Sequence, residues 1–163
     1  MSALKLLLET YRDASLTERE KGTYFEDLVV CYLKTEATYQ DLYSEVWTYA
    51  EWAKLQGISK QDTGIDLVAK TRGTEEFYAI QCKFYADTYK VQKPDIDSFF
   101  TASGKKPFVY RIIVTTTNNW SEHANDALQN QSPPVSKIDL QDLENSQIDR
   151  PMQPYGVAGK RSE

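Results

Sequence analysis

The fold of this chain is decided by residues 64–85, GIDLVAKTRGTEEFYAIQCKFY. Two runs rich in aliphatic and aromatic residues, GIDLVAKT and FYAIQCKFY, flank RGTEE, whose glycine suits a turn. This pattern predicts a β-hairpin. Three polar side chains, those of Asp66, Gln81 and Lys83, interrupt the apolar runs and require an explanation.

The alternation of side chains along a strand predicts where these polar groups point. Gln81 and Lys83 are two residues apart, so they share one face of their strand. In the preceding strand we expect Asp66 to share its face with Val68, and Ile65 to point to the opposite face. If the strands pair, a carboxylate, an amide oxygen and an ammonium group meet at the strand ends. Burying any one of them alone would cost on the order of several kcal/mol, so each needs a polar partner, water or a metal ion.

Carboxylate and amide oxygens are hard ligands of the kind that Mg²⁺ or Mn²⁺ accepts together with water and phosphate oxygens. Such a metal lowers the pKa of a bound water, and a nearby lysine stabilises negative charge on the reacting group. This combination is suited to hydrolysis of a phosphodiester. The residues alone leave a second interpretation open, in which the hairpin faces solvent and Lys83 forms an ion pair with Asp66.

Composition excludes several other classes of protein. The chain has 163 residues, of which 40% are apolar and 26% charged, which fits one compact domain. It contains no apolar run of about 18 residues and no signal-peptide pattern, which predicts a soluble, cytoplasmic protein with no membrane partner. A single histidine, His123, argues against a zinc site or a serine or cysteine triad. Cys31 and Cys82 form no CxxC motif and suit reduced core positions, and no phosphate-binding loop is present.

The charge distribution gives a mixed signal about nucleic acid. The net charge of −5 argues against such a partner, because binding phosphates takes clustered lysine and arginine side chains. The segment from Lys70 to Arg111, however, contains eight basic and five acidic residues. Its net charge is therefore +3, and the rest of the chain carries −8. A chain polarised in this way can bind a polyanion on one face, although so small an imbalance is also typical of a solvated surface.

Local patterns predict the order of helices and strands. A capping box at Thr17 and Glu20, followed by apolar residues at helical spacing, predicts a long helix over about residues 17–37. The other expected elements are strands at 64–71, 77–85, 110–117 and 135–140, and helices at 93–103 and 121–129. Residues 44–49 could form a short strand and 50–56 a helical turn or two ending at Gly57, but their aromatic-rich composition leaves this assignment open. This order predicts an α/β domain at residues 1–144, with a mixed central sheet flanked by helices. Residues 145–163 contain few core positions and are interpreted as a linker or tail.

Three motifs in order resemble a known family. The motifs are KGTYFEDLV at 21–29, DTGIDLVA at 62–69 and YAIQCKFY at 78–85, and RIIVTTTNNWSEHANDAL follows at 111–128. Together they resemble the Mrr-like branch of the PD-(D/E)XK nuclease superfamily over roughly residues 20–125. With EVWTYAEWAKLQG at 45–57, the chain most resembles the N-terminal nuclease domain of single-polypeptide Type I (Type ISP) restriction-modification enzymes.

The resemblance implies a restriction-endonuclease-like core and a role for each polar residue of the hairpin. By position, Asp66 would be the central metal ligand, Gln81 would take the second acidic position, and Lys83 would be the catalytic lysine. Glu26 matches the acidic residue of the first helix, and Asp62 either contacts a second metal or, as we favour, caps the turn before the strand. Because Gln81 is neutral, the site would carry two carboxylates and depend more on substrate phosphate for metal affinity. One-metal and two-metal mechanisms both remain open.

The same resemblance implies Mg²⁺-dependent (or Mn²⁺-dependent) hydrolysis of double-stranded DNA, with little sequence specificity in this domain. Lys90, Lys93, Lys105 and Lys106 are candidate contacts for backbone phosphates, although solvated loop lysines have the same appearance. In Type ISP enzymes the nuclease is covalently linked to helicase/translocase, methyltransferase and target-recognition domains, so ATP would act only through those domains. The alternative is a noncatalytic module of the same fold that binds DNA or another protein.

Overall fold

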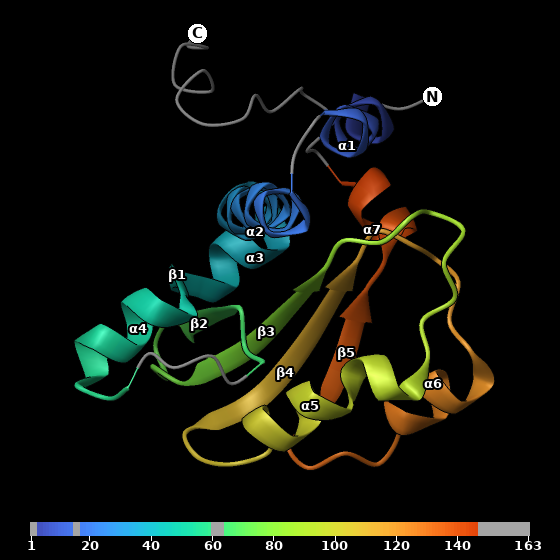
Figure 1. The fold of residues 1–163 in the computed structure, drawn as a ribbon. Coiled ribbons are helices and arrows are strands. Elements are labelled where there is room, and N and C mark those ends of the chain that lie inside the picture. The colour runs from blue at the N-terminus through green and yellow to red at the C-terminus, as the bar shows by residue number, and fades with distance from the viewer. Residues whose placement is uncertain (1–2, 15–16, 60–63, 147–163) are drawn as a thin grey trace, which may run out of the picture.

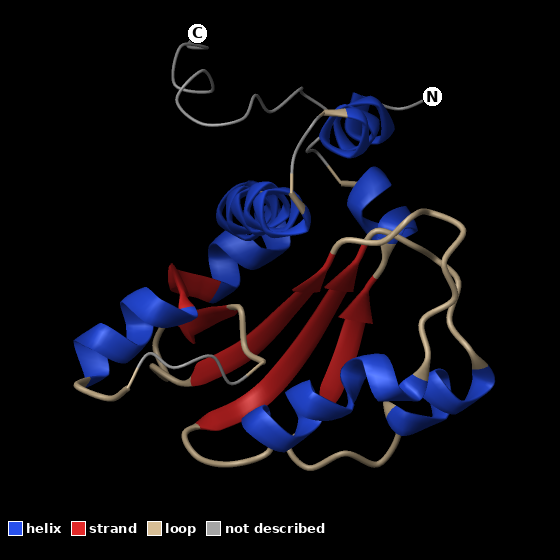
Figure 2. Cartoon of the chain, viewed as in Figure 1, coloured by secondary structure: helices blue, strands red, loops and turns tan. Residues whose placement is uncertain are grey.

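The computed structural model describes residues 3–14, 17–59 and 64–146, and these form a mixed five-stranded sheet between two layers of helices (Figures 1 and 2). The strands are β1 Tyr43–Thr48, β2 Leu67–Thr71, β3 Phe77–Lys83, β4 Phe108–Thr115 and β5 Val135–Ile138. They lie in the order β1-β2-β3-β4-β5, and the first three are antiparallel whereas β4 and β5 run parallel to β3. The predicted β-hairpin and mixed sheet are confirmed.

Helices cover both faces of the sheet. One layer contains α1 Ala3–Asp13, α2 Glu18–Thr35, α3 Ala37–Leu42 and α7 Leu140–Glu144. The other contains α4 Tyr49–Gln56, α5 Lys93–Ser103 and α6 Glu122–Ala127. Figure 1 shows α2 crossing the sheet on the side opposite α5 and α6. Among the described residues, no helix combines the length and the apolar character needed to cross a membrane.

Capping residues set the ends of two helices as predicted. Thr17 Oγ1 accepts from Glu20 N at 3.0 Å, and Glu20 Oε1 accepts from Thr17 N at 2.9 Å, so α2 begins with the expected capping box. The second helix, α4, ends at Gly57. The φ of Gly57 is 72°, in the left-handed region that glycine adopts at low cost. Both ends follow from local chemistry, which is why the sequence identified them.

Strand alternation divides the core into two clusters, one on each face of the sheet. Leu67 and Ile80 pack with α1, α2 and α7, whereas Val68 and Ala79 pack with α4, α5 and α6. The prediction for Ile65 was wrong, because this residue packs in the same cluster as Val68. The predicted strand at 64–71 begins only at Leu67, so side-chain alternation does not extend back to Ile65.

Three helices of the structure were not predicted: α1, α3 and α7. α1 buries Leu4, Leu7, Leu8 and Tyr11 in the core cluster that it shares with α2 and α7. α3 and α7 have only 6 and 5 residues, too few for a sequence pattern to distinguish them from turns. Of the predicted C-terminal segment 145–163, only residues 145 and 146 are described.

Candidate active site

Asp66 lies immediately before the first residue of β2 and is held against the last part of β3. Its backbone N–H donates to Ile80 O at 3.0 Å, and its carbonyl accepts from Tyr49 N at 2.9 Å. Its carboxylate oxygen Oδ2 accepts a 2.7 Å hydrogen bond from Cys82 N. The half-buried side chain is therefore tied to the backbone of β3, beside the residues that complete the candidate site.

Gln81 presents an amide oxygen that no residue of the described ranges contacts by a hydrogen bond. Its Nε2 donates to Gly64 O at 3.1 Å, and because a carbonyl can only accept, Oε1 must be directed away from Gly64. Gly64 adopts a φ of 90°, which favours glycine and sets the direction of this carbonyl. Gln81 is 3% exposed, and Oε1 is buried without a hydrogen-bond partner among the described residues. A buried amide oxygen of this kind calls for an ion or a water.

Helix α2 brings Glu26 toward the end of β3. The neighbouring Phe25 packs against Phe84, with ring centroids 5.7 Å apart. The pKa of the Cys82 thiol is raised well above its usual value, first by burial and then by the negative charges of Asp66 and Glu26. Both carboxylates therefore lie close enough to one thiol to act on it, so the helix and the hairpin bring them to the same region.

Lys83 is the last residue of β3 and pairs with Thr115 of the parallel strand β4. It is half-buried and lies two residues beyond Gln81, on the same face of the strand, as predicted. Lys83 forms no ion pair with any residue in the described ranges. The Lys83–Asp66 ion pair expected for a solvent-facing hairpin is thus not formed.

Side chains that the sequence did not single out anchor the segment following Lys83. Thr116 Oγ1 accepts from Tyr85 N at 2.7 Å and donates to Tyr85 O at 2.6 Å. Arg12 Nη2, from the end of α1, donates to the same carbonyl at 2.8 Å. The available signal was the run of three threonines after a buried strand, because buried hydroxyl groups require partners.

The oxygen atoms of the candidate site are of the type that a hard divalent cation binds, but only two of the three groups carry a negative charge. Asp66 and Glu26 supply carboxylates, and the unpartnered Gln81 Oε1 supplies a neutral oxygen of the type that Mg²⁺ accepts. Within residues 3–14, 17–59 and 64–146, no group of three or more His, Cys, Asp and Glu side chains is arranged to hold a metal. Because Gln81 is neutral, the candidate group offers two carboxylates, those of Asp66 and Glu26.

The four candidate phosphate-binding lysines do not form one patch. Lys105 and Lys106 are exposed in the loop before β4, at the opposite end of the strands from Lys83. Six residue steps along β3 correspond to about 20 Å at 3.3 Å per residue. Lys90 and Lys93 are exposed on the segment that leads from Lys83 into α5, and Lys93 forms a 3.0 Å ion pair with the side chain one turn later.

The remaining candidate residues are placed as follows. His123 is exposed on α6, and Cys31 and Cys82 are half-buried and do not form a disulfide with each other. Asp62 lies outside the described residues. Neither His123 nor Cys31 is therefore part of the group around Asp66.

The mixed sheet, the hairpin and the position of α2 define a restriction-endonuclease-like α/β fold. Several solved structures share it, among them the following three. The ATP-dependent Type ISP restriction-modification enzyme LlaBIII bound to DNA is similar with a TM-score of 0.68 and 34% identity, covering 87% of this chain and 9% of that one. The DNA modification-dependent restriction endonuclease AspBHI has a TM-score of 0.55 and 15% identity, covering 86% of this chain and 34% of that one. The MspJI restriction endonuclease in complex with a 27-mer oligonucleotide has a TM-score of 0.54 and 15% identity, covering 87% and 30%. This chain therefore spans about a tenth of the length of LlaBIII.

The amino-acid sequence also matches the restriction endonuclease family Mrr_cat_2 over residues 34–155, and the chain belongs to this family. The match contains Asp66, Gln81 and Lys83 but begins after Glu26. A search of the curated proteins gave no match. The family match thus covers the hairpin and does not include the acidic residue on α2.

Proposed function

We propose that this chain is the Mg²⁺-dependent (or Mn²⁺-dependent) nuclease domain, residues 1–144, of a larger ATP-dependent restriction-modification enzyme. It nicks or cleaves double-stranded DNA by hydrolysing phosphodiester bonds, with little sequence specificity of its own. The observation that carries this proposal is the buried Oε1 of Gln81, unpartnered among the described residues, one residue before Cys82, whose backbone N–H holds the carboxylate of Asp66. An acceptor left in this state within the core is best explained by a cation that completes it.

The residues of this chain take separate roles in the proposed reaction. Asp66, Gln81 and Glu26 would hold the cation, which when bound would supply Lewis-acid stabilisation and acidify a water. Lys83 places an ammonium group, not engaged by any described carboxylate, where negative charge on the phosphate develops. The hydrogen bonds to Cys82 and Gly64 fix the two hairpin ligands before substrate arrives, which reduces the cost of assembling the site.

Delivery of DNA is expected to depend on other domains. The chain carries a net charge of −5, and its candidate phosphate-binding lysines are dispersed, so its intrinsic affinity for DNA should be low. The similar Type ISP enzyme is ATP-dependent and about ten times longer than the matched region. Covalently linked helicase/translocase, methyltransferase and target-recognition domains would provide the substrate, and ATP would be bound there rather than by this chain.

The test is plasmid nicking in Mg²⁺ or Mn²⁺, by the chain alone and by the chain fused to a DNA-binding domain. Wild-type chain should convert supercoiled to open-circular plasmid, faster when fused, because tethering raises the local DNA concentration. Lys83→Ala should abolish conversion in both formats, while Lys54→Ala, an exposed lysine on α4, should not change it. Equal nicking by Lys83→Ala and wild type would refute the assignment.

A noncatalytic module of the same fold is favoured by one observation, the absence of a three-carboxylate cluster among the described residues. The two functions are separated by measuring DNA binding and cutting on the same fused protein. If the fused protein binds plasmid to saturation but does not cut it in Mg²⁺ or in Mn²⁺, the noncatalytic module is favoured.

A further inference from the structure

Helix α1 contacts the segment that follows Lys83 through Arg12, in its last turn. The Arg12 guanidinium donates from Nη2 to the carbonyl of Tyr85 at 2.8 Å, and its Cζ lies 5.3 Å from the centroid of the Phe84 ring. Tyr85 and Phe84 are the two residues directly after Lys83, which ends β3. The family match begins at residue 34, so neither α1 nor Arg12 is part of it.

The Tyr85 carbonyl is held by two donors that are far apart in the sequence. Thr116 Oγ1, just beyond β4, donates to it at 2.6 Å and accepts from Tyr85 N at 2.7 Å, and Arg12 supplies the second hydrogen bond to the same oxygen. Thr116 is fully buried, and its own N–H donates to the carbonyl of Lys83 at 3.3 Å. Two donors use both lone pairs of the Tyr85 carbonyl, which fixes the path of the chain directly beyond Lys83.

The Phe84 ring connects the same contact to the acidic residue of α2. Phe84 packs edge-on against Tyr11 of α1, with ring centroids 6.2 Å apart, and against Phe25 of α2 at 5.7 Å. Phe25 immediately precedes Glu26, just as Phe84 immediately follows Lys83. Helix α1 therefore contacts the sequence neighbours of two candidate site residues that come from different elements.

Stability alone is a poor explanation for this arginine. Its ion pair with Glu9, at 3.0 Å, involves a carboxylate that is 45% exposed, and exposed ion pairs contribute little to stability. Its Nε is buried and has no hydrogen-bond partner among the described residues, which costs free energy. The contacts that remain are those with Tyr85 and Phe84, directly after the candidate catalytic lysine.

On the basis of the proposed nuclease function, we infer that Arg12 is a positioning residue of the active site. Through the Tyr85 carbonyl and the Phe84 ring it holds Lys83 at a fixed position relative to Glu26, so that the ammonium group and the metal-binding oxygens meet the same phosphate. A displacement of about 1 Å at a reacting group can lower a rate about a hundredfold. Loss of Arg12 should therefore slow hydrolysis far more than it weakens DNA binding.

The first measurement is single-turnover plasmid nicking in Mn²⁺ by the fused protein at increasing concentration. Arg12→Ala should lower the rate at saturation about tenfold to a hundredfold and leave the half-saturating protein concentration unchanged. Arg12→Lys, which retains a cation able to donate to the Tyr85 carbonyl, should recover part of the rate. A wild-type rate in Arg12→Ala, or a loss that higher protein concentration fully restores, would overturn the inference.

The second measurement needs neither metal nor DNA. In the ¹³C-labelled chain, the Cε signal of Lys83 is assigned by its loss in Lys83→Ala. Arg12→Ala should move this signal toward those of exposed lysines such as Lys54, because the Lys83 side chain loses its fixed surroundings. An unmoved Lys83 signal overturns the inference whether or not the chain cuts DNA. Failure of the wild-type chain to nick, by contrast, counts against the proposed function alone.

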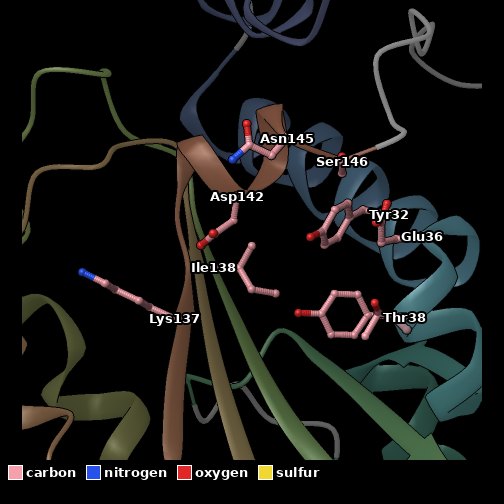
Figure 3. Close-up of a pocket in the computed structure, with 9 residues that line it drawn as sticks. Tyr32, Glu36, Thr38, Lys137, Ile138, Asp142, Asn145 and Ser146 are labelled. Carbon is pink, nitrogen blue, oxygen red and sulfur yellow. The ribbon is translucent and has the colours of Figure 1, made fainter.

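Two control variants separate positioning from a general effect on this layer of helices. Glu9→Gln removes the ion pair of Arg12 but none of its contacts with the segment after β3. Thr38→Ala removes an exposed side chain of α3, which lies across from Asp142 at a cavity between α2, α3, β5 and α7 (Figure 3). Both should keep the wild-type rate and the wild-type lysine signal, and an equal loss in Glu9→Gln and Arg12→Ala would overturn the inference. If Arg12→Ala does not fold, Arg12→Gln, which is shorter and uncharged, replaces it with the same expected loss.

Discussion

Cys82 N donates a 2.7 Å hydrogen bond to Asp66 Oδ2, so a side chain continues the hairpin beyond its last backbone pair, Leu67 with Ile80. The same carboxylate is the proposed central metal ligand. Asp66 therefore contributes to stability through one oxygen and to the proposed chemistry through the other. This double role makes its two simplest substitutions informative.

Asp66→Ala should destabilise the fold by about 1.5–3 kcal/mol, the usual contribution of a hydrogen bond to a charged group, because Cys82 N would lose its acceptor. Asp66→Asn retains an oxygen of the same size and should lose less stability. Both should abolish plasmid nicking, since neither supplies a carboxylate. Urea unfolding and nicking assays on the same preparations measure the two effects, and an Asn variant that nicks like wild type would exclude Asp66 as a metal ligand.

Gln81→Glu should make stability depend on metal. The new carboxylate cannot donate to Gly64 O and sits in a buried position, so we expect a loss of about 2 kcal/mol or more without metal. Mn²⁺ should restore much of this loss, because a third carboxylate strengthens the proposed site. The measurement is the midpoint of thermal unfolding with and without Mn²⁺. A midpoint that Mn²⁺ raises equally in Gln81→Glu and in Gln81→Glu/Asp66→Asn would contradict the proposed ligand set.

The Cys82 thiol reports the position of Glu26. Its pKa is raised by burial and by the charges of Asp66 and Glu26, so at about pH 8 it should react with a disulfide reagent more slowly than an unfolded cysteine. Glu26→Gln removes one of these charges and should raise the thiolate fraction about threefold, equivalent to half a pKa unit. The assay uses a Cys31→Ser background. Asp27→Asn, which removes an exposed carboxylate on the next residue, serves as control and should leave the rate unchanged.

Much of the fold was readable because its signals are local. The capping box of α2, the glycine after α4 and the turn of the hairpin each specify structure within a few residues. Ile65 was misplaced because alternation holds only inside a strand, and its strand begins two residues later. The short helices α3 and α7 depend on packing against the sheet rather than on their own propensity, so no local pattern marks them.

In the candidate site, too, contacts within the hairpin were predictable, whereas contacts between distant parts of the sequence were not. Asp66 and Gln81 are joined by one hairpin, so strand pairing alone predicts that they approach each other. The support from Arg12 and Thr116 to the segment after Lys83 connects residues far apart in sequence, and only the folded chain reveals it. The hydrogen bond between Gln81 and Gly64, which leaves an oxygen without a partner, is likewise a matter of side-chain orientation that spacing cannot give.

Arg111 is a buried cation that forms no ion pair with a carboxylate in the described part of the chain, and it should be important for stability alone. It is 1% exposed, and its guanidinium donates to the carbonyls of Phe100 at 3.2 Å and Pro133 at 2.6 Å. Arg111→Met retains the length but leaves these carbonyls unpaired, so we expect a loss of about 2–4 kcal/mol in the free energy of unfolding. Val109→Ala, on the same strand but exposed, is the control and should change little. Similar urea midpoints for both variants would show that the arginine is dispensable.

Alkaline pH should destabilise the domain through its buried tyrosines. Burial, with the nearby charge of Asp27 next in importance, raises the pKa of Tyr11 from 10.0 to about 12, and burial also raises the pKa of Tyr32 and Tyr43. Above about pH 10 the unfolded chain loses these protons while the folded chain keeps them, so the free energy of unfolding falls as pH rises. For Tyr11 the loss approaches about 2–3 kcal/mol once the pH reaches its folded-state pKa. Urea unfolding at several pH values measures the slope, which should be smaller in Tyr11→Phe, and a slope that this substitution leaves unchanged would show that Tyr11 ionises as freely in the folded as in the unfolded chain.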